Sequence, residues 1–159
     1  MQTFALRLKP HEDLKQSLQE WVAYQDIQAG CMVSAVGSLE QATLRFAGRS
    51  ASRLLKRKFE IVSLVGTLSR QGLHLHISLA DAWGRVIGGH LMEGCLVYTT
   101  AELVLAELPE YVFNREIDRH TGYLELIIRE SSKPLSSTNG LFSYPRFNCS
   151  ESDRGEFAD

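Results

Sequence analysis

The sequence is poor in cysteine, and this scarcity excludes two common scaffolds of small proteins. The three cysteines, Cys31, Cys95 and Cys149, are far apart, and no two of them form a CxxC pair. An odd number of widely spaced cysteines fits neither a disulfide framework nor a cysteine-based zinc site. We therefore expect a protein of the reducing cytoplasm.

Long apolar runs and an excess of one charge are also lacking. No stretch approaches the roughly 20 apolar residues of a membrane-spanning helix, and the first residues, MQTFALRLKPHEDL, contain no signal-peptide core. We therefore expect no membrane partner. The net charge of -2 gives no general attraction to nucleic acid, so DNA binding would need a local basic patch. The 159 residues, 44% of them hydrophobic, fit one domain with a real core.

Alternating apolar residues predict one early helix and many strands. Residues 3–9 alternate as a half-buried strand does, and Leu14, Leu18, Trp21 and Val22 then fall at helical spacing. Glu12 and Asp13 suit the first helical turn, and Gly30 marks a stop. Further strand-like segments follow at 31–39, 42–48, 59–69, 73–81, 85–91, 95–108 and 121–130, with a break at Glu40–Gln41 between the first two. This order predicts an α+β fold, mainly antiparallel β-sheet with a few flanking helices.

The composition changes after Glu130. Residues 131–159 are rich in serine, glycine, proline and asparagine and show no periodicity. We therefore expect a domain at residues 1–130 and a mobile polar tail at 131–159.

Three of the five histidines lie within HLHISLADAWGRVIGGHL, residues 74–91. Residues two apart in a strand share a face, so His74 and His76 point the same way. A hairpin centred on Trp83, with Gly84 in the left-handed position of a three-residue loop, places His90 directly opposite His76. Three converging nitrogens suit a zinc site whose fourth position stays open. Half-exposed histidines satisfied by water or carboxylates remain an alternative, as do histidines that serve only a subunit interface.

Two acidic residues near this hairpin are candidates for supporting roles. Asp81 suits the cap of the Trp83 turn and is also a possible acceptor for a histidine N–H. Glu93, three residues after His90, is a general-base candidate or an ordinary surface glutamate.

Basic residues are concentrated between Arg45 and Lys58, where no acidic residue intervenes. Such a run favours either a solvated surface or a nucleic-acid contact. The candidate contact residues are Arg49, Arg53, Lys56, Arg57 and Lys58.

The stretch FEIVSLVGTLSRQGLHLHISLADAWGRVIGGHLMEGCLVYTTAELVL strongly resembles the PPC ("plants and prokaryotes conserved") domain family. The shared features are FEIxSLxGT, GxHLHxSxAD, GxVxGGHL and TTAE. RLKPHEDL near the N-terminus, AGCMVSAVGSLEQATLRFAG and the TGYLEL segment extend the match to about residues 4–130. His11 departs from the pattern, because many members have a glycine after the proline.

The resemblance implies a compact α+β domain that forms a homotrimer. Plant members are nuclear regulators in which a DNA-binding AT-hook precedes the domain, and the present sequence contains no such motif. The family also resembles acetolactate decarboxylase in fold, and that likeness implies that His74, His76 and His90 bind zinc. It does not transfer the decarboxylase reaction.

Two functions follow as expectations. The first is a trimeric binding or regulatory module, with DNA or a regulatory protein as partner. The second is a zinc-dependent lyase- or hydrolase-like enzyme that acts on a small anionic or carbonyl-containing molecule. The sequence identifies no catalytic residue for it.

Overall fold

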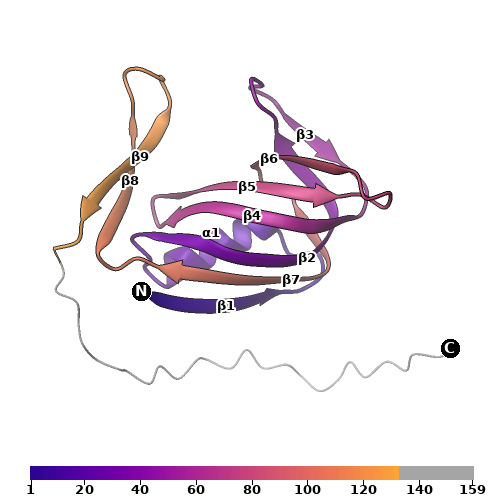
Figure 1. Ribbon diagram of the computed structural model, residues 1–159, viewed down its shortest axis with the longest axis horizontal. Coiled ribbons are helices and arrows are strands. Elements are labelled where there is room, and N and C mark those ends of the chain that lie inside the picture. Colours follow the sequence, from indigo (N-terminus) through magenta and orange to yellow (C-terminus); the bar gives the residue numbers. More distant parts are fainter. Residues whose placement is uncertain (133–159) are drawn as a thin grey trace.

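The computed structural model describes residues 1–132, which fold as a mainly antiparallel α+β domain (Figure 1). The predicted fold class is confirmed, although the described residues contain a single α-helix instead of a few. Of the predicted tail, only residues 131 and 132 are described. The elements are β1 (Gln2–Leu8), α1 (Leu14–Tyr24), β2 (Gly30–Arg45), β3 (Ser52–Leu55), β4 (Phe59–Ser69), β5 (Gly72–Ala80), β6 (Val86–Leu91), β7 (Leu96–Glu107), β8 (Tyr111–Ile117) and β9 (Leu124–Glu130).

The main sheet has the strand order β1-β7-β2-β4-β5-β6, and its strand pairs are antiparallel. The end of β2 also pairs with β6, through Leu44 with Leu91 and Arg45 with His90. Strands β2, β4, β5 and β6 therefore close on one another, which brings β6 back against the far end of β2. β3 pairs with the same end of β2.

The break expected at Glu40–Gln41 is wrong, because β2 is one continuous strand of 16 residues. The irregularity is confined to its pairing with β7, where the register shifts between Leu39 and Gln41. Gln41 still pairs with Leu96, and Ala42 pairs with Leu55 of β3, so the backbone stays hydrogen-bonded through the predicted break. A bulge changes the twist of a strand without ending it.

Helix α1 begins directly after the two acidic residues that were predicted for its first turn. Asp13 is its N-cap, and the side-chain oxygen accepts hydrogen bonds from the backbone N–H groups of Lys15 and Gln16, both at 3.0 Å. Glu12 lies before the helix, where its carboxylate accepts from the Lys9 backbone N–H at 2.6 Å. The helix ends at Tyr24, and Gly30 begins β2 instead of stopping the helix.

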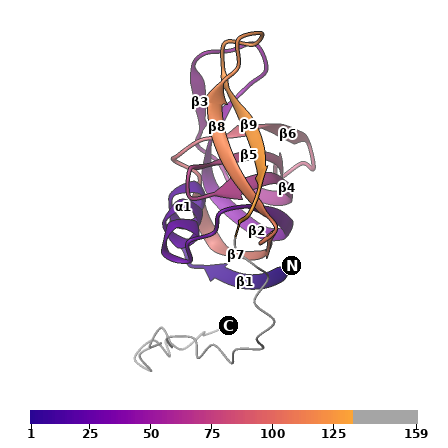
Figure 2. The same ribbon diagram turned by 90° about the vertical axis from the view of Figure 1, so that its left-hand side faces the viewer.

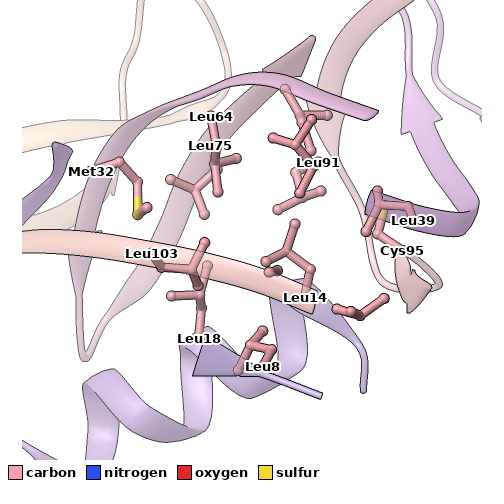
Figure 3. Close-up of a cluster of buried hydrophobic side chains, with 14 of the residues drawn as sticks. Leu8, Leu14, Leu18, Met32, Leu39, Leu64, Leu75, Leu91, Cys95 and Leu103 are labelled. Atoms are coloured by element: carbon pink, nitrogen blue, oxygen red, sulfur yellow. The ribbon is translucent and has the colours of Figure 1, made fainter. Parts of the chain in front are cut away.

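The hydrophobic core lies between α1 and the sheet (Figures 1 and 3). The apolar stripe of the helix, Leu14, Leu18 and Val22, is fully buried, as its spacing predicts. Cys95 is also fully buried there, and burial raises the pKa of its thiol to about 11. Cys95 is therefore a small residue of the core.

Strands β8 and β9 form a separate two-stranded sheet that stands beside the main sheet (Figures 1 and 2). The guanidinium of Arg115 in β8 donates a hydrogen bond to the Thr67 hydroxyl in β4 at 3.3 Å. This contact ties the hairpin to the sheet beside the strand that carries His74 and His76. No helix in residues 1–132 has the length and apolar character needed to cross a membrane.

Candidate metal centre

The predicted register of the β5–β6 hairpin is confirmed, with His76 opposite His90. No register shift interrupts the pairing from His76–His90 to Ala80–Val86. The turn between the strands has Gly84 at a φ of +75°, the left-handed conformation expected for a three-residue loop. In β5, Leu75 and Ile77 are buried in the core, so His74 and His76 lie on the opposite face of the strand.

The three imidazole rings converge on one point. The ring centroids lie 5.1 Å apart for His74 and His76, 5.2 Å for His74 and His90, and 5.5 Å for His76 and His90. One ring nitrogen from each residue can be chosen so that all three lie within 4.8 Å of one another. Nitrogens around one tetrahedral ion are about 3.3 Å apart, given metal–nitrogen bonds of about 2.0 Å. The three nitrogens would therefore have to approach one another by at most about 1.5 Å to share one ion.

The state of the His90 ring fits a metal ligand. Its Nδ1 atom is buried and has no hydrogen-bond partner among the described residues, which is rare for a buried polar atom. Burial, followed by the positive charge of Arg45, lowers the pKa of His90 to about 4. Burial and then the charge of Arg115 lower the pKa of His74 as well. Metal coordination requires neutral imidazoles, and this environment keeps both rings neutral near pH 7.

Glycines let the strands approach closely enough for the rings to meet. A Cβ on Gly88 would lie 2.7 Å from the Ile77 carbonyl oxygen, and one on Gly89 would lie 2.9 Å from that of Arg45. The Gly88–Gly89 pair therefore permits close approach of β6 to both β5 and β2. Gly66 in β4, at a φ of +142°, does the same for β5, because its Cβ would lie 1.9 Å from the His74 carbonyl oxygen.

Asp81 holds the hairpin turn. Its carboxylate accepts hydrogen bonds from the backbone N–H groups of Trp83 and Arg85, at 3.0 and 3.1 Å, and from the Arg85 side chain. The turn-capping role predicted for it is thus observed. Within residues 1–132 no hydrogen bond joins Asp81 to a histidine ring.

Glu93 lies in the bend between β6 and β7, and its side chain is exposed. It does not line the cavity beside the histidines. The bend is held by its neighbour Gly94, whose backbone N–H donates to the Asp13 carboxylate.

A cavity of about 240 Å³ lies beside His74 and His76. Thr67 of β4 and two charged residues of the β8–β9 hairpin, Arg115 and Glu125, also line it. No pattern in the sequence pointed to Arg115 or Glu125 at this site. They follow the histidines by a long stretch of chain, and only the packing of the hairpin against β4 places them there.

The basic run does not form one uniform patch. Arg57 lies 3.8 Å from the Asp81 carboxylate and its guanidinium stacks over Phe59, while the Lys58 amine donates to the Tyr98 hydroxyl at 2.5 Å. Arg49 and Arg53 instead line a hollow of about 530 Å³ at the β2–β3 connection. Lys56 is exposed in the β3–β4 connection.

Arg45, which begins the basic run, also lies beside the three histidines. It pairs with His90 across β2 and β6, and its charge contributes to the lowered pKa of both His74 and His90. The three histidines are therefore flanked by Arg45 on one side and Arg115 on another.

Fold and site together define a β-rich domain with a three-histidine group that could hold a metal ion. The chain matches the Plants and Prokaryotes Conserved (PCC) domain over residues 1–109. It belongs to this family, the same one that the sequence motifs indicate under the abbreviation PPC.

Solved structures share this fold. A hypothetical protein from Salmonella cholerae-suis (Salmonella enterica) is 40% identical, with a TM-score of 0.80, over 81% of this chain and 94% of its own. A metal-containing protein from Archaeoglobus fulgidus is 27% identical, with a TM-score of 0.69, over 80% of this chain and 94% of its own.

A curated relative is much longer than this chain. The protein named Bifunctional protein GlmU from Synechococcus sp. (strain JA-2-3B'a(2-13)) is 53% identical over 129 residues, which are 81% of this chain. The chain spans about a fifth of that relative's length, since the match covers 20% of it.

Proposed function

We propose that this chain is a PPC-domain binding module that holds one zinc ion through His74, His76 and His90. The observation that carries the proposal is the convergence of three imidazoles, one of which has a buried nitrogen without a partner. Three neutral nitrogens with no fourth protein ligand in their group are the donor set of an open zinc site. A similar fold in a metal-containing protein from Archaeoglobus fulgidus adds support.

Metal analysis of untagged protein tests the zinc site. We expect about one equivalent of zinc per chain, and under about a tenth of an equivalent in His76→Ala, because two nitrogens hold zinc far less tightly than three. His120→Ala is the matched control, since His120 is exposed in the β8–β9 turn. Wild-type protein with under a tenth of an equivalent after zinc loading would refute the site.

The module is proposed to act as a homotrimer, as its family resemblance implies. Neighbouring strands β2 and β4 carry four exposed valines, Val33, Val36, Val62 and Val65, each more than half exposed in the single chain. Apolar side chains gathered on adjacent strands are typical of surfaces that another subunit covers. This observation supports self-association.

DNA is the partner proposed for the basic residues, with a regulatory protein as the alternative. The charges available are those of Arg49, Arg53 and Lys56, which form no ion pair within residues 1–132. Arg57 and Lys58 are partly engaged by other side chains. A trimer would repeat the set three times and strengthen a weak contact.

Gel-shift titration of random-sequence duplex at several salt concentrations tests this interface. Counterion release makes the affinity fall steeply with salt, and the triple change of Arg49, Arg53 and Lys56 to glutamine should flatten that dependence. Arg129→Gln, a charge removed from the hairpin, serves as the control. Absence of a shift at low salt would refute direct DNA binding.

A zinc-dependent lyase- or hydrolase-like enzyme is the second candidate. The observation that favours it is the cavity beside the histidines, which carries both a guanidinium and a carboxylate. Bound zinc would act as a Lewis acid toward a small anionic or carbonyl compound. Following such compounds by NMR with zinc-loaded protein tests this function, and Glu93→Gln tests the general-base role proposed for Glu93. If the zinc-loaded protein converts none of these compounds, the enzyme is refuted and the binding module is the remaining proposal.

A further inference from the structure

We infer that the cavity beside His74 and His76 binds a small organic acid whose carboxylate pairs with the guanidinium of Arg115. The inference rests on the proposed function, because the other end of the acid would face the zinc site. It deepens that function by naming the class of ligand and the residue that selects it.

Arg115 has the donors to hold a carboxylate. Its Nη2 donates to the Thr67 hydroxyl at 3.3 Å, and its Nη1 donates to the Leu124 carbonyl oxygen at 3.4 Å. These two contacts fix the guanidinium at the cavity while leaving most of its five N–H groups free. No carboxylate forms an ion pair with Arg115 within residues 1–132. A fixed, unneutralised guanidinium is suited to bidentate recognition of a carboxylate.

The charge around the site also favours an anion. Arg115 lines the cavity together with His74 and His76, and Arg45 pairs with His90 across β2 and β6. Among the described residues, Glu125 is the one acidic residue that lines the cavity. A divalent ion on the three histidines would add two positive charges. The net charge around the cavity is therefore positive. Arg115 at one end of the cavity and the metal ion at the other would attract separate oxygens of one ligand.

The size of the cavity suits a small ligand. Its volume of about 240 Å³ is below the roughly 300 Å³ at which pockets for drug-sized molecules begin. An acid of a few carbon atoms has a size that matches this space. The apolar side chains of Val65 and Leu126 also line the space and suit a short hydrocarbon chain.

Calorimetric titration of zinc-loaded protein tests the inference, with succinate as the probe and neutral succinamide as the uncharged comparison. We expect succinate to bind at least about tenfold more tightly than succinamide in the wild type. Arg115→Gln should reduce this preference while retaining bound zinc, because only the attraction of the zinc end for a carboxylate then remains. Arg129→Gln is the matched control, because Arg129 lies on the same hairpin, pairs with Glu116 and does not line the cavity.

Glu125→Gln supplies a change of opposite sign. Removing its negative charge should tighten succinate binding by about threefold and leave succinamide unaffected, because only the anion is repelled by the carboxylate. If Arg115 and Glu125 served only to dock the hairpin, both variants would lower the affinity for succinate and for succinamide to the same extent.

Each outcome decides the inference. Equal binding of succinate and succinamide by zinc-loaded wild type, or an unchanged preference in Arg115→Gln, overturns it while the zinc site stands. If inorganic phosphate binds more tightly than succinate, the proposal that the ligand is a carboxylic acid is overturned. Failure of the wild type to retain zinc is a failure of the proposed function, visible in the metal analysis, and the inference falls with it.

Discussion

At the scale of single residues, the burial of His90 determines the protonation state of its ring and therefore its suitability for a metal ion. Its buried Nδ1 has no partner in the described chain, and its pKa is lowered to about 4 by burial and then by Arg45. A ring that is costly to protonate and has a free lone pair is prepared for a metal ion. Sequence spacing can place such a ring, but it cannot show how deeply the ring is buried.

The lowered pKa predicts how the stability of the metal-free protein depends on pH. The unfolded chain takes up a proton on His90 near its ordinary value of 6.5, whereas the folded chain does so only near 4. The stabilisation is therefore complete above about pH 6.5 and is lost as the pH falls toward 4. His74, also with a lowered pKa, adds an effect of the same sign.

Urea unfolding of chelator-treated protein at several pH values across this range measures the effect. We expect His90→Gln to flatten the decline in the free energy of unfolding, while His120→Gln leaves it unchanged. An equally steep decline in His90→Gln would show that other groups cause it.

At the scale of elements, glycines decide how closely strands β4 and β5 pack. Gly66 and Gly72 have nearly the same positive φ, +142° and +137°. A Cβ on Gly66 would collide with the His74 carbonyl oxygen, whereas one on Gly72 would meet nothing within 4 Å. An added Cβ thus causes backbone strain at both positions but a steric collision only at Gly66, so comparing the two separates these effects.

Gly66→Ala should therefore cost more stability than Gly72→Ala. We expect about 1 kcal/mol for Gly72→Ala from strain alone, and at least about 2 kcal/mol more for Gly66→Ala, where the strands must also separate. Chemical denaturation measures both values. The zinc affinity of Gly66→Ala should fall as well, since the displaced strand carries His74. Equal losses of stability would contradict the steric argument.

The hairpin turn offers a separate prediction for Asp81. Asp81→Ala removes the acceptor for two backbone N–H groups and the Arg85 side chain, and should cost about 1–3 kcal/mol. Zinc content should stay at the wild-type level, because Asp81 stabilises the turn and does not contact the histidine rings. A loss of zinc at unchanged stability would instead restore its predicted role as an acceptor for a histidine.

At the scale of the whole molecule, the exposed valines of β2 and β4 predict subunit association. Val36→Lys places a charge on this surface and should convert the proposed trimer to a monomer, as measured by size-exclusion chromatography with light scattering. Val86→Lys is the control, because Val86 is comparably exposed but lies on β6 beside the hairpin turn. A monomeric wild type, or a Val36→Lys protein that remains trimeric, would contradict the assignment of this surface.

The sequence by itself determined the histidine hairpin. Strand alternation puts His74 and His76 on one face, and the symmetry of the turn about Trp83 puts His76 opposite His90. Both rules are local, since they depend only on the two-residue repeat of a strand and the length of one loop. The motifs around the hairpin also predicted that the chain belongs to the PPC family, and the match over residues 1–109 confirms this prediction.

Only the tertiary structure decided what surrounds that hairpin. Thr67 and Arg115 are 48 positions apart, and their contact depends on how the β8–β9 hairpin packs against β4. The same holds for Arg45, which reaches His90 because β6 closes onto β2, and for the continuity of β2 across Glu40–Gln41. Long-range packing is the sum of many weak contacts and leaves no short pattern in the sequence. The position of these charged residues beside the histidines was therefore visible only in the folded chain.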